Sequence, residues 1–232
     1  MRSHASSCGS CAIVPESLDA ASQAGVVLGS LEALRRYPIK SLRGEPLDRV
    51  EVGQTGIPGD RAAALFAREG AREGKTYRGK ENDRLHLLDE AEAAKGLARE
   101  RGVGVEIRRD EHYFDDAPLS LIVDAWLADV SAYTGYPVQW ERFRPNFFVR
   151  SFEQGVPLER ELVGRDLLLG EVRLRVRAPI GRCVTVTYHP NGEPSDPRIL
   201  EYVAQQRDNA MGIYCDVVAP GVVARGDALR LL

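Results

Sequence analysis

Cys183 lies in a run of residues that can give its thiol a chemical role. The run is Ala-Pro-Ile-Gly-Arg-Cys-Val-Thr-Val-Thr, residues 178–187. Arg182 stands beside the cysteine, and a neighbouring cation favours the thiolate, which attacks electrophiles or binds a soft metal. The commonest role of a lone cysteine in a strand is, however, that of a small buried apolar side chain. The run alone therefore leaves two interpretations open, a reactive or metal-binding thiolate and a core residue.

Two segments in the first part of the chain offer groups that bind anions. Lys40 and Ser41 follow a proline in Arg-Tyr-Pro-Ile-Lys-Ser (36–41), and they supply an ammonium group and a hydroxyl. Arg61 ends Gly-Ile-Pro-Gly-Asp-Arg (56–61), where two glycines around a proline predict a tight turn. Its guanidinium suits bidentate recognition of phosphate. The alternatives are a solvated loop for the first pair and a surface ion pair with the preceding aspartate for Arg61.

Two segments in the second part of the chain complete the pattern. Arg144 and Asn146 occur in Phe-Arg-Pro-Asn-Phe (143–147), among large apolar residues. If these polar side chains are buried they need partners, which an anionic ligand or an internal salt bridge can supply. Residues 212–227 begin with a strand-like alternation through Cys215, which we expect to be a core residue.

These five segments, in this order, resemble the MOSC family, which is named for the C-terminal domain of molybdenum-cofactor sulfurases. The resemblance covers roughly residues 28–232, and it is to two-part members such as the amidoxime-reducing components. It implies a molybdenum cofactor (Mo-molybdopterin), with Cys183 as the metal ligand and catalytic residue. It also implies that a set of polar residues binds this cofactor: Lys40, Ser41, Arg61, Arg78, Arg144, Asn146 and Arg182. One departure is Gly181, where animal amidoxime reducers often have a hydroxyl residue.

The function implied by this resemblance is the reduction of N-hydroxylated compounds, such as amidoximes and hydroxylamines. Because the sequence shows no signature of a flavin, haem or iron–sulfur site, we expect the electrons to come from a partner protein, such as a reductase, a ferredoxin or a b-type cytochrome. One alternative is a molybdenum-cofactor or sulfur carrier, in which Cys183 holds a persulfide or the metal without substrate turnover. Another is a barrel that binds nothing. His86, His112 and His189 are too isolated to predict a metal site.

The composition is that of an ordinary globular protein. The 232 residues are 44% hydrophobic and 28% charged, with a formal net charge of −3, which argues against a general nucleic-acid-binding protein. No window approaches the ~20 apolar residues that span a membrane. Four cysteines are too few for a disulfide scaffold, so we expect a reducing cytoplasm. Residues 1–25, which contain Cys8 and Cys11, lack periodicity and are predicted to be a disordered leader.

The remaining pattern predicts an α+β fold that is mainly β, because short strand-like runs occur with few helices and no βαβ rhythm. The resemblance implies a MOSC-type β-barrel with a few surrounding helices, divided into an N-terminal β-barrel subdomain (26–115) and a MOSC domain (116–232). Helices are predicted over 87–101, 119–133 and 198–206, with Ser120 as a capping residue of the second. Strands are predicted mainly over 47–52, 61–67, 103–107, 138–143, 147–149, 167–169, 172–176 and 184–188.

Overall fold

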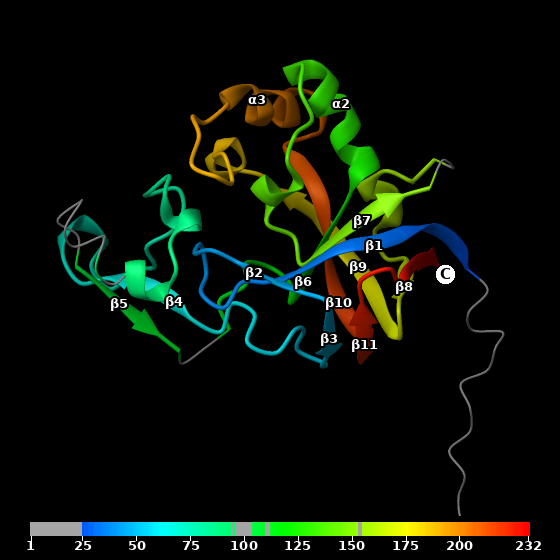
Figure 1. Cartoon of the computed structure of the whole chain (residues 1–232), viewed down its shortest axis with the longest axis horizontal. Helices are drawn as coiled ribbons and strands as arrows, with labels where there is room; N and C mark the ends of the chain where they lie inside the picture. Colours follow the sequence, from blue (N-terminus) through cyan, green and yellow to red (C-terminus); the bar gives the residue numbers. More distant parts are fainter. Residues whose placement is uncertain (1–24, 94, 96–103, 110–111, 153–154) are drawn as a thin grey trace, which may run out of the picture.

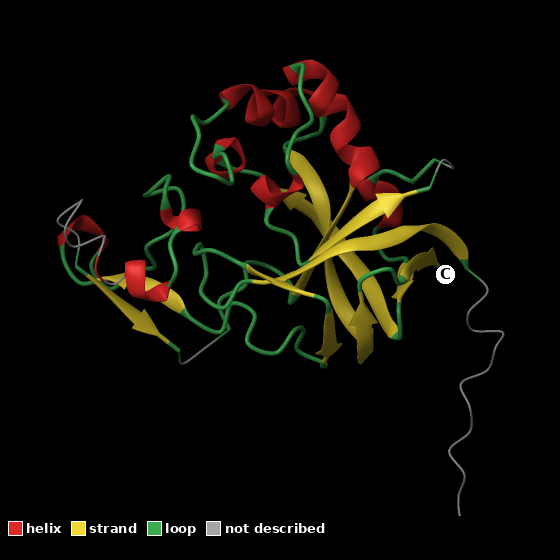
Figure 2. Cartoon of the chain, viewed as in Figure 1, coloured by secondary structure: helices red, strands yellow, loops and turns green. Residues whose placement is uncertain are grey.

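Strands dominate the protein, the two longest helices lie at one end of it, and short helical segments also lie at its side (Figure 1; Figure 2). The computed structural model describes residues 25–93, 95, 104–109, 112–152 and 155–232. Residues 1–24 of the predicted leader lie outside the described residues, and so do residues 94 and 96–101 of the helix predicted over 87–101. No helix in the described part is long and apolar enough to cross a membrane.

Seven strands form a closed β-barrel. In chain order they are β1 (Val26–Arg36), β6 (Leu119–Val123), β7 (Phe147–Ser151), β8 (Asp166–Leu169), β9 (Val172–Gly181), β10 (Ala210–Ala219) and β12 (Ala228–Leu231). Their order around the barrel is β12-β8-β9-β10-β6-β7-β1, and pairing between β1 and β12 completes the ring. All of these pairs are antiparallel except β6–β7, which is parallel. The predicted fold class, mainly β with a barrel and few helices, is confirmed.

The side-chain pattern of each strand explains its place in the barrel wall. Along β9, Val172, Leu174 and Val176 are at most 1% exposed, whereas Arg173 and Arg175 face the solvent. This alternation is typical of a strand with one face on the core. In contrast, β6 is buried along its whole length.

Two helices, α2 (Asp124–Thr134) and α3 (Pro197–Gln206), cover one end of the barrel (Figure 1). Trp126 of α2 and Val203 of α3 are at most 2% exposed and join the same hydrophobic core as the barrel strands. Asp196 caps α3, because its carboxylate accepts a 3.0 Å hydrogen bond from the backbone N–H of Arg198. The helix predicted over 198–206 is confirmed.

Short strands also extend from the barrel or lie outside it, among them β2 (Glu45–Leu47), β3 (Arg49–Val52), β4 (Ala64–Ala67) and β5 (Val105–Arg108). β2 extends the sheet beside β1, and β3 pairs with β11 (Gly221–Ala224). β4 pairs with β5 at the side of the barrel (Figure 1), over a second hydrophobic cluster that contains Leu42, Leu65 and Leu85. The division at residue 115 stays a prediction. Two strands that precede this residue, β1 and β3, pair with strands that follow it.

Three predicted elements differ from the structure. Residues 119–133 form β6 and then α2 rather than one helix, so Ser120 lies inside a strand and caps nothing. Residues 138–143 and 184–188, predicted as strands, contain the 3-10 helices η4 (Trp140–Phe143) and η6 (Val184–Thr187). Strand propensity is a weak preference, which the packing around these short segments overrides.

Candidate functional site

A cavity of about 760 Å³ brings all the predicted site residues together. Its wall includes Lys40, Ser41, Arg61, Arg78, Arg144, Asn146, Arg182 and Cys183. These residues come from five segments: the loop after β1, the turn before β4, the loop before η3 (Leu85–Leu87), the connection from η4 to β7, and the end of β9. Segments that are far apart in the sequence therefore meet at one site.

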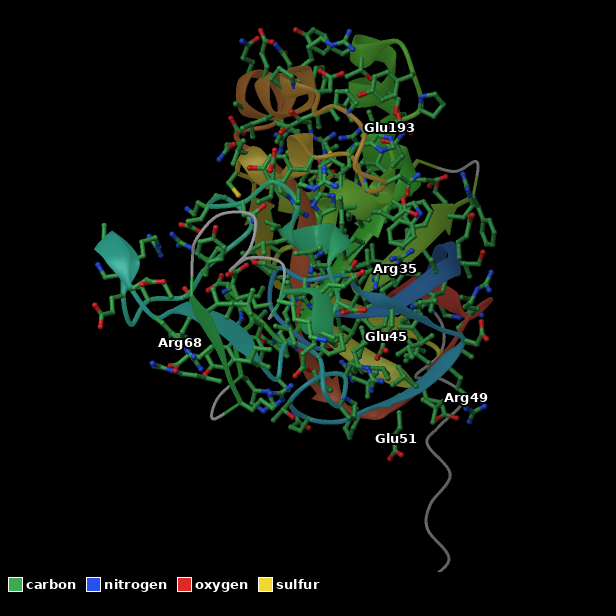
Figure 3. All side chains as sticks on the ribbon, turned by 60° about the vertical axis from the view of Figure 1, so that its left-hand side comes forward. Arg35, Glu45, Arg49, Glu51, Arg68 and Glu193 are labelled. Carbon is green, nitrogen blue, oxygen red and sulfur yellow. The ribbon has the colours of Figure 1, made fainter. Side chains whose placement is uncertain are left out.

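The cavity lies away from the end of the barrel that carries β3. Arg35, at the end of β1, and Asn191 both line it. In Figure 3, Arg35 lies between Glu193 and two side chains of β3, Arg49 and Glu51, which are at the opposite end of the molecule from Glu193. Glu193 closely follows Asn191 in the chain.

Cys183 lies where β9 gives way to η6. Its backbone is extended, and it is the capping residue of η6. The side chain is exposed and lines the cavity, and its Sγ lies 3.3 Å from Oγ1 of Thr185. Cys215, in contrast, is 0% exposed in β10, where burial raises the pKa of its thiol. The expectation that Cys215 is a core residue is confirmed, and of these two thiols only Cys183 can reach a ligand in the cavity.

The guanidinium of Arg182 has one N–H group without a partner. Nε donates to the Met211 carbonyl at 2.7 Å, and Nη1 donates to the Phe143 carbonyl at 3.0 Å. Nη2 is buried and has no hydrogen-bond partner among the described residues. Burial lowers the pKa of Arg182 to about 10, so the side chain remains a cation at neutral pH. A buried donor that lacks an acceptor is costly. Arg182 also lines the cavity as a cation without a carboxylate partner among the described residues, and such a cation favours an anionic ligand there.

Arg61 forms an ion pair with Asp60 that is buried, whereas the sequence alternative was a surface pair. The Asp60 carboxylate accepts hydrogen bonds from Nη1 of Arg61 and, at 2.7 Å, from the Tyr37 backbone N–H. Asp60 is 4% exposed. Burial alone would lower the pKa of Arg61, but the carboxylate raises it above its usual value. Arg61 also donates to the Arg144 carbonyl at 3.2 Å, which ties the two predicted anion-binding residues together.

Arg144 has no carboxylate partner in the part of the chain that the structure describes. Its Nη2 donates to the Leu42 carbonyl at 2.6 Å. The guanidinium carbons of Arg144 and Arg61 lie 4.3 and 4.8 Å from the centre of the Tyr37 ring. Burial lowers the pKa of Arg144 to about 10, and the nearby Arg61 cation acts in the same direction. Two guanidinium groups are thus held close together over one ring, an arrangement that an anion would stabilise.

Backbone strain is concentrated in the cavity wall. Ser41, Arg61 and Arg144 have φ angles of 70°, 47° and 53°, in the left-handed region that residues with a side chain rarely adopt. Each such residue costs on the order of 1–3 kcal/mol, and strained residues cluster at ligand-binding sites. Three of the predicted site residues share this property, which the sequence did not indicate.

The other predicted residues have partners within the protein. Lys40 pairs with Asp115 at 2.5 Å, and Arg78 pairs with Glu81 at 2.8 Å. Asn146 is 1% exposed, and its Oδ1 accepts hydrogen bonds from both the backbone N–H and the hydroxyl of Ser120. The Ser120 hydroxyl therefore helps to join β6 to the start of β7.

The cavity wall as a whole is basic. Nine lysine and arginine side chains line it, against the two carboxylates of Asp115 and Glu141. Three of the nine, Arg142, Arg144 and Arg182, hydrogen-bond only to carbonyl and amide oxygens of the described residues. An excess of positive charge in a cavity attracts anionic ligands.

Sequence reasoning missed other residues of the wall. His86, Lys80, Tyr188 and Tyr214 line the cavity as well. Tyr214 lies in the segment 212–227, but that segment did not mark it as a site residue, and the other three stand in no motif. His86 meets Tyr188 only through the fold, with ring centres 6.0 Å apart. No group of three or more His, Cys, Asp or Glu side chains in the described ranges could hold a metal ion. A metal bound by Cys183 would therefore need further ligands from a cofactor.

The model of the MOSC domain matches residues 108–230, which is more than half of the chain. The protein belongs to the MOSC family. The match includes the segments with Arg144, Asn146, Arg182 and Cys183, and it leaves the Lys40, Ser41, Arg61 and Arg78 side of the cavity outside it.

Solved structures resemble this MOSC protein at low sequence identity. The YUAD protein from Bacillus subtilis is 18% identical, with a TM-score of 0.52 over 88% of this chain and 94% of that chain. YiiM from Geobacillus stearothermophilus is 12% identical, with a TM-score of 0.46 over 89% and 74% of the two chains. YiiM from Escherichia coli is 17% identical, with a TM-score of 0.41 over 86% and 70%. The YUAD comparison supports the fold alone. No curated protein matches the sequence significantly.

Proposed function

We propose that this protein binds a molybdenum cofactor in the cavity and uses it to reduce N-hydroxylated compounds, such as amidoximes and hydroxylamines. The observation that carries the proposal is the Arg182 cation at the cavity wall, without a carboxylate partner among the described residues, beside the exposed thiol of Cys183. The cation favours an anionic ligand, and the thiol is a soft ligand for a metal at the same wall. Membership of the MOSC family supports the choice of cofactor.

The residues of the cavity fit the chemistry of this cofactor, which is anionic and carries its own sulfur ligands. Arg144 and Arg182 have no carboxylate partners among the described residues, so they are the side chains best placed to neutralise an anion. Lys40, Ser41, Arg61 and Arg78 would add donors at the same wall. Cys183 would supply the protein's ligand to the metal.

The reaction consumes two electrons and two protons for each N–OH group, and it yields an N–H group and water. When bound, the cofactor supplies the two-electron chemistry that breaks the N–O bond. The chain would fix Cys183 by contacts on both sides of it. The backbone N–H of Arg182, the preceding residue, donates to the Asn209 carbonyl, and Nη1 of Arg142 donates at 2.8 Å to the carbonyl of Thr187, the last residue of η6. The electrons would come from a partner protein such as a reductase, a ferredoxin or a b-type cytochrome.

Metal and pterin analysis of the purified protein tests the cofactor. We expect molybdenum and pterin in equal amounts, and reduction of benzamidoxime when a chemical electron donor is added. Arg182→Met should lower cofactor retention roughly ten- to a hundredfold, because a hydrogen bond to a charged group contributes about 1.5–3 kcal/mol. Arg173→Met, on the solvent face of β9, is the matched control and should retain the cofactor. A folded wild-type protein without molybdenum or pterin would overturn the proposal.

The exposure of Cys183 favours one other function, a carrier of the cofactor or of sulfur. A carrier must release its cargo to another protein, so an accessible thiol suits it as well. The two functions differ in turnover. A carrier would hold molybdenum or a persulfide and would leave benzamidoxime unchanged, whereas the proposed reductase would convert it to benzamidine.

A further inference from the structure

His86 lies in η3, and its ring forms part of the cavity wall. Its Nε2 lies 2.8 Å from the backbone carbonyl oxygen of His189. A carbonyl oxygen can only accept a hydrogen bond, so Nε2 must carry the proton. Nδ1 then has a free lone pair when the ring is neutral. It has no hydrogen-bond partner in the described ranges, and it is not among the atoms sealed inside the protein.

The chain around His86 packs on the turn that begins at Cys183. The His86 ring stacks on Tyr188, the residue that ends η6, with the ring planes 20° apart. Gly79, on the same wall, packs closely on this turn, because a Cβ there would lie 3.0 Å from Cγ2 of Thr185. Thr185 in turn contacts the Cys183 thiol. The imidazole and the thiol therefore belong to two segments in direct contact, and both face one cavity.

The surroundings of His86 keep its ring neutral at pH 7. Burial lowers its pKa below the ordinary value of 6.5. Burial is the largest cause. The hydrogen bond to the His189 carbonyl and the charge of Asp83 raise the pKa, whereas the cations Arg144 and Arg142 lower it, and the net shift is downward. Nδ1 is consequently a hydrogen-bond acceptor on a wall whose other polar groups are mostly cationic donors.

We propose that Nδ1 of His86 accepts a hydrogen bond from the hydroxyl of the substrate's N–OH group, and that it selects free N-hydroxyl compounds over their O-alkyl ethers. The inference rests on the proposed reductase function and specifies its substrate. An N–OH group has a proton to donate, whereas an N–OCH₃ group has none. A basic wall offers many donors to a substrate oxygen, but an acceptor such as Nδ1 recognises its hydroxyl proton.

The test compares benzamidoxime with O-methylbenzamidoxime as substrates of the cofactor-loaded protein, with a chemical electron donor. The ratio of the two kcat/KM values measures selection for the hydroxyl. In His86→Phe, which keeps an aromatic ring beside Tyr188, this ratio should fall roughly three- to tenfold, the effect of one neutral hydrogen bond. His86→Gln should keep most of the selection, because its amide can donate to the His189 carbonyl and accept from the substrate. His112→Phe, on an exposed residue outside the cavity wall, is the control.

A second measurement does not depend on turnover. In oxidised protein labelled with ¹⁵N-histidine, the resonance of the unprotonated Nδ1 of His86 should shift when benzamidoxime is added and stay in place when the O-methyl ether is added. The inference is wrong if the ratio of the two kcat/KM values is the same in His86→Phe as in the wild type, or if this resonance does not respond to benzamidoxime. The reductase function stands in either case. A cofactor-loaded wild-type protein that reduces neither compound overturns both proposals.

Discussion

Arg182 and Cys183 are neighbours in the chain, yet their side chains have opposite environments. The thiol is exposed, whereas the guanidinium is held by two backbone carbonyls, with one N–H group left buried and unpartnered. Gly212 packs against this guanidinium, since a Cβ there would lie 3.0 Å from Nη2 of Arg182, and its φ of 81° is one that residues with a side chain rarely adopt. A side chain at position 212 would therefore both strain the backbone and crowd Arg182.

Cys183→Ser should abolish benzamidoxime reduction and leave the fold intact. The hydroxyl is nearly the same size as the thiol, but it stays protonated at neutral pH and is a poor ligand for molybdenum. Pterin should remain bound through the arginine residues, with an altered molybdenum spectrum. The measurements are activity, molybdenum and pterin content, and circular dichroism. A fully active Cys183→Ser protein would contradict the ligand role.

Cys215→Ser is the matched control and should have the opposite effect. Because Cys215 is completely buried in β10, the new hydroxyl loses its hydrogen bonds to water. The free energy of unfolding should fall by about 1–3 kcal/mol, while activity per folded molecule is kept. Urea denaturation and activity assays measure the two effects separately.

The sequence indicated the polar residues of the cavity, but it could not identify their partners. The sequence suggests a pairing of Arg61 with Asp60, but the burial of this pair depends on Tyr37 and Arg144, which only the fold brings to it. His86 is isolated in the sequence, and its stacking on Tyr188 joins residues about one hundred positions apart, beyond the reach of local periodicity. The cofactor-binding role of these residues stays a prediction.

Elements of the chain were predictable where their pattern was local. α3 has a capping aspartate, a proline in its first turn and helical spacing of apolar residues, and these signals fix its start. All five residues of β6 are buried, so its sequence shows no alternation and cannot be told apart from the helix that follows it, α2. In η6 the β-branched Val and Thr residues favoured a strand, but the Arg142 guanidinium and the Thr187 hydroxyl bind carbonyls of a helical turn. Strand propensity is too weak to oppose such contacts.

Asp196, the capping residue of α3, should make the free energy of unfolding depend on pH in the acidic range. Hydrogen bonds from Arg198 and Tyr136 lower the pKa of Asp196 to about 2. A carboxylate whose pKa is lower in the folded state stabilises the protein above its unfolded pKa of about 3.9, and this stabilisation is lost as the pH falls toward 2. By pH 3 the loss should be about 1 kcal/mol relative to pH 7.

Asp196→Asn tests this dependence. The amide oxygen still accepts from the backbone of α3 but cannot titrate, so the change in stability between pH 7 and pH 3 should shrink by about 1 kcal/mol. Urea midpoints at the two pH values provide the measurement. Asp129→Asn, at an exposed position of α2, should keep the wild-type dependence. If Asp196→Asn and the wild type lose the same stability between pH 7 and pH 3, then Asp196 does not control the pH dependence.

At the scale of the molecule, the barrel includes strands from both sides of the predicted boundary at residue 115. β1 pairs with β7 on one side and with β12 on the other, so its apolar residues share a core with the rest of the barrel. The family resemblance predicted a barrel, but no local pattern could show that β1 closes it, because the partners of a strand are set by contacts distant in sequence.

Leu31→Ala should therefore destabilise the whole molecule. Leu31 lies on β1 in the barrel core and is 1% exposed, and such a truncation costs about 2–5 kcal/mol. Unfolding should remain a single transition, with the same midpoint by tryptophan fluorescence and by circular dichroism. Val26→Ala, on the same strand but 61% exposed, should change stability by less than about 0.5 kcal/mol. Two transitions, only one of which moves in Leu31→Ala, would show that residues 26–115 and 116–232 unfold separately.

The closure of the barrel by β1 and β12 has a consequence for the protein as it is synthesised. Val26 pairs with Leu231, about 200 residues later, and a ribosome takes about 10–40 seconds to add that many residues. During this time β1 has no partner strand at one edge, and an unpaired edge is open to pairing with other chains. A chaperone that shields this first strand until β12 has left the ribosome would increase the yield of folded protein more than one that acts on the completed chain.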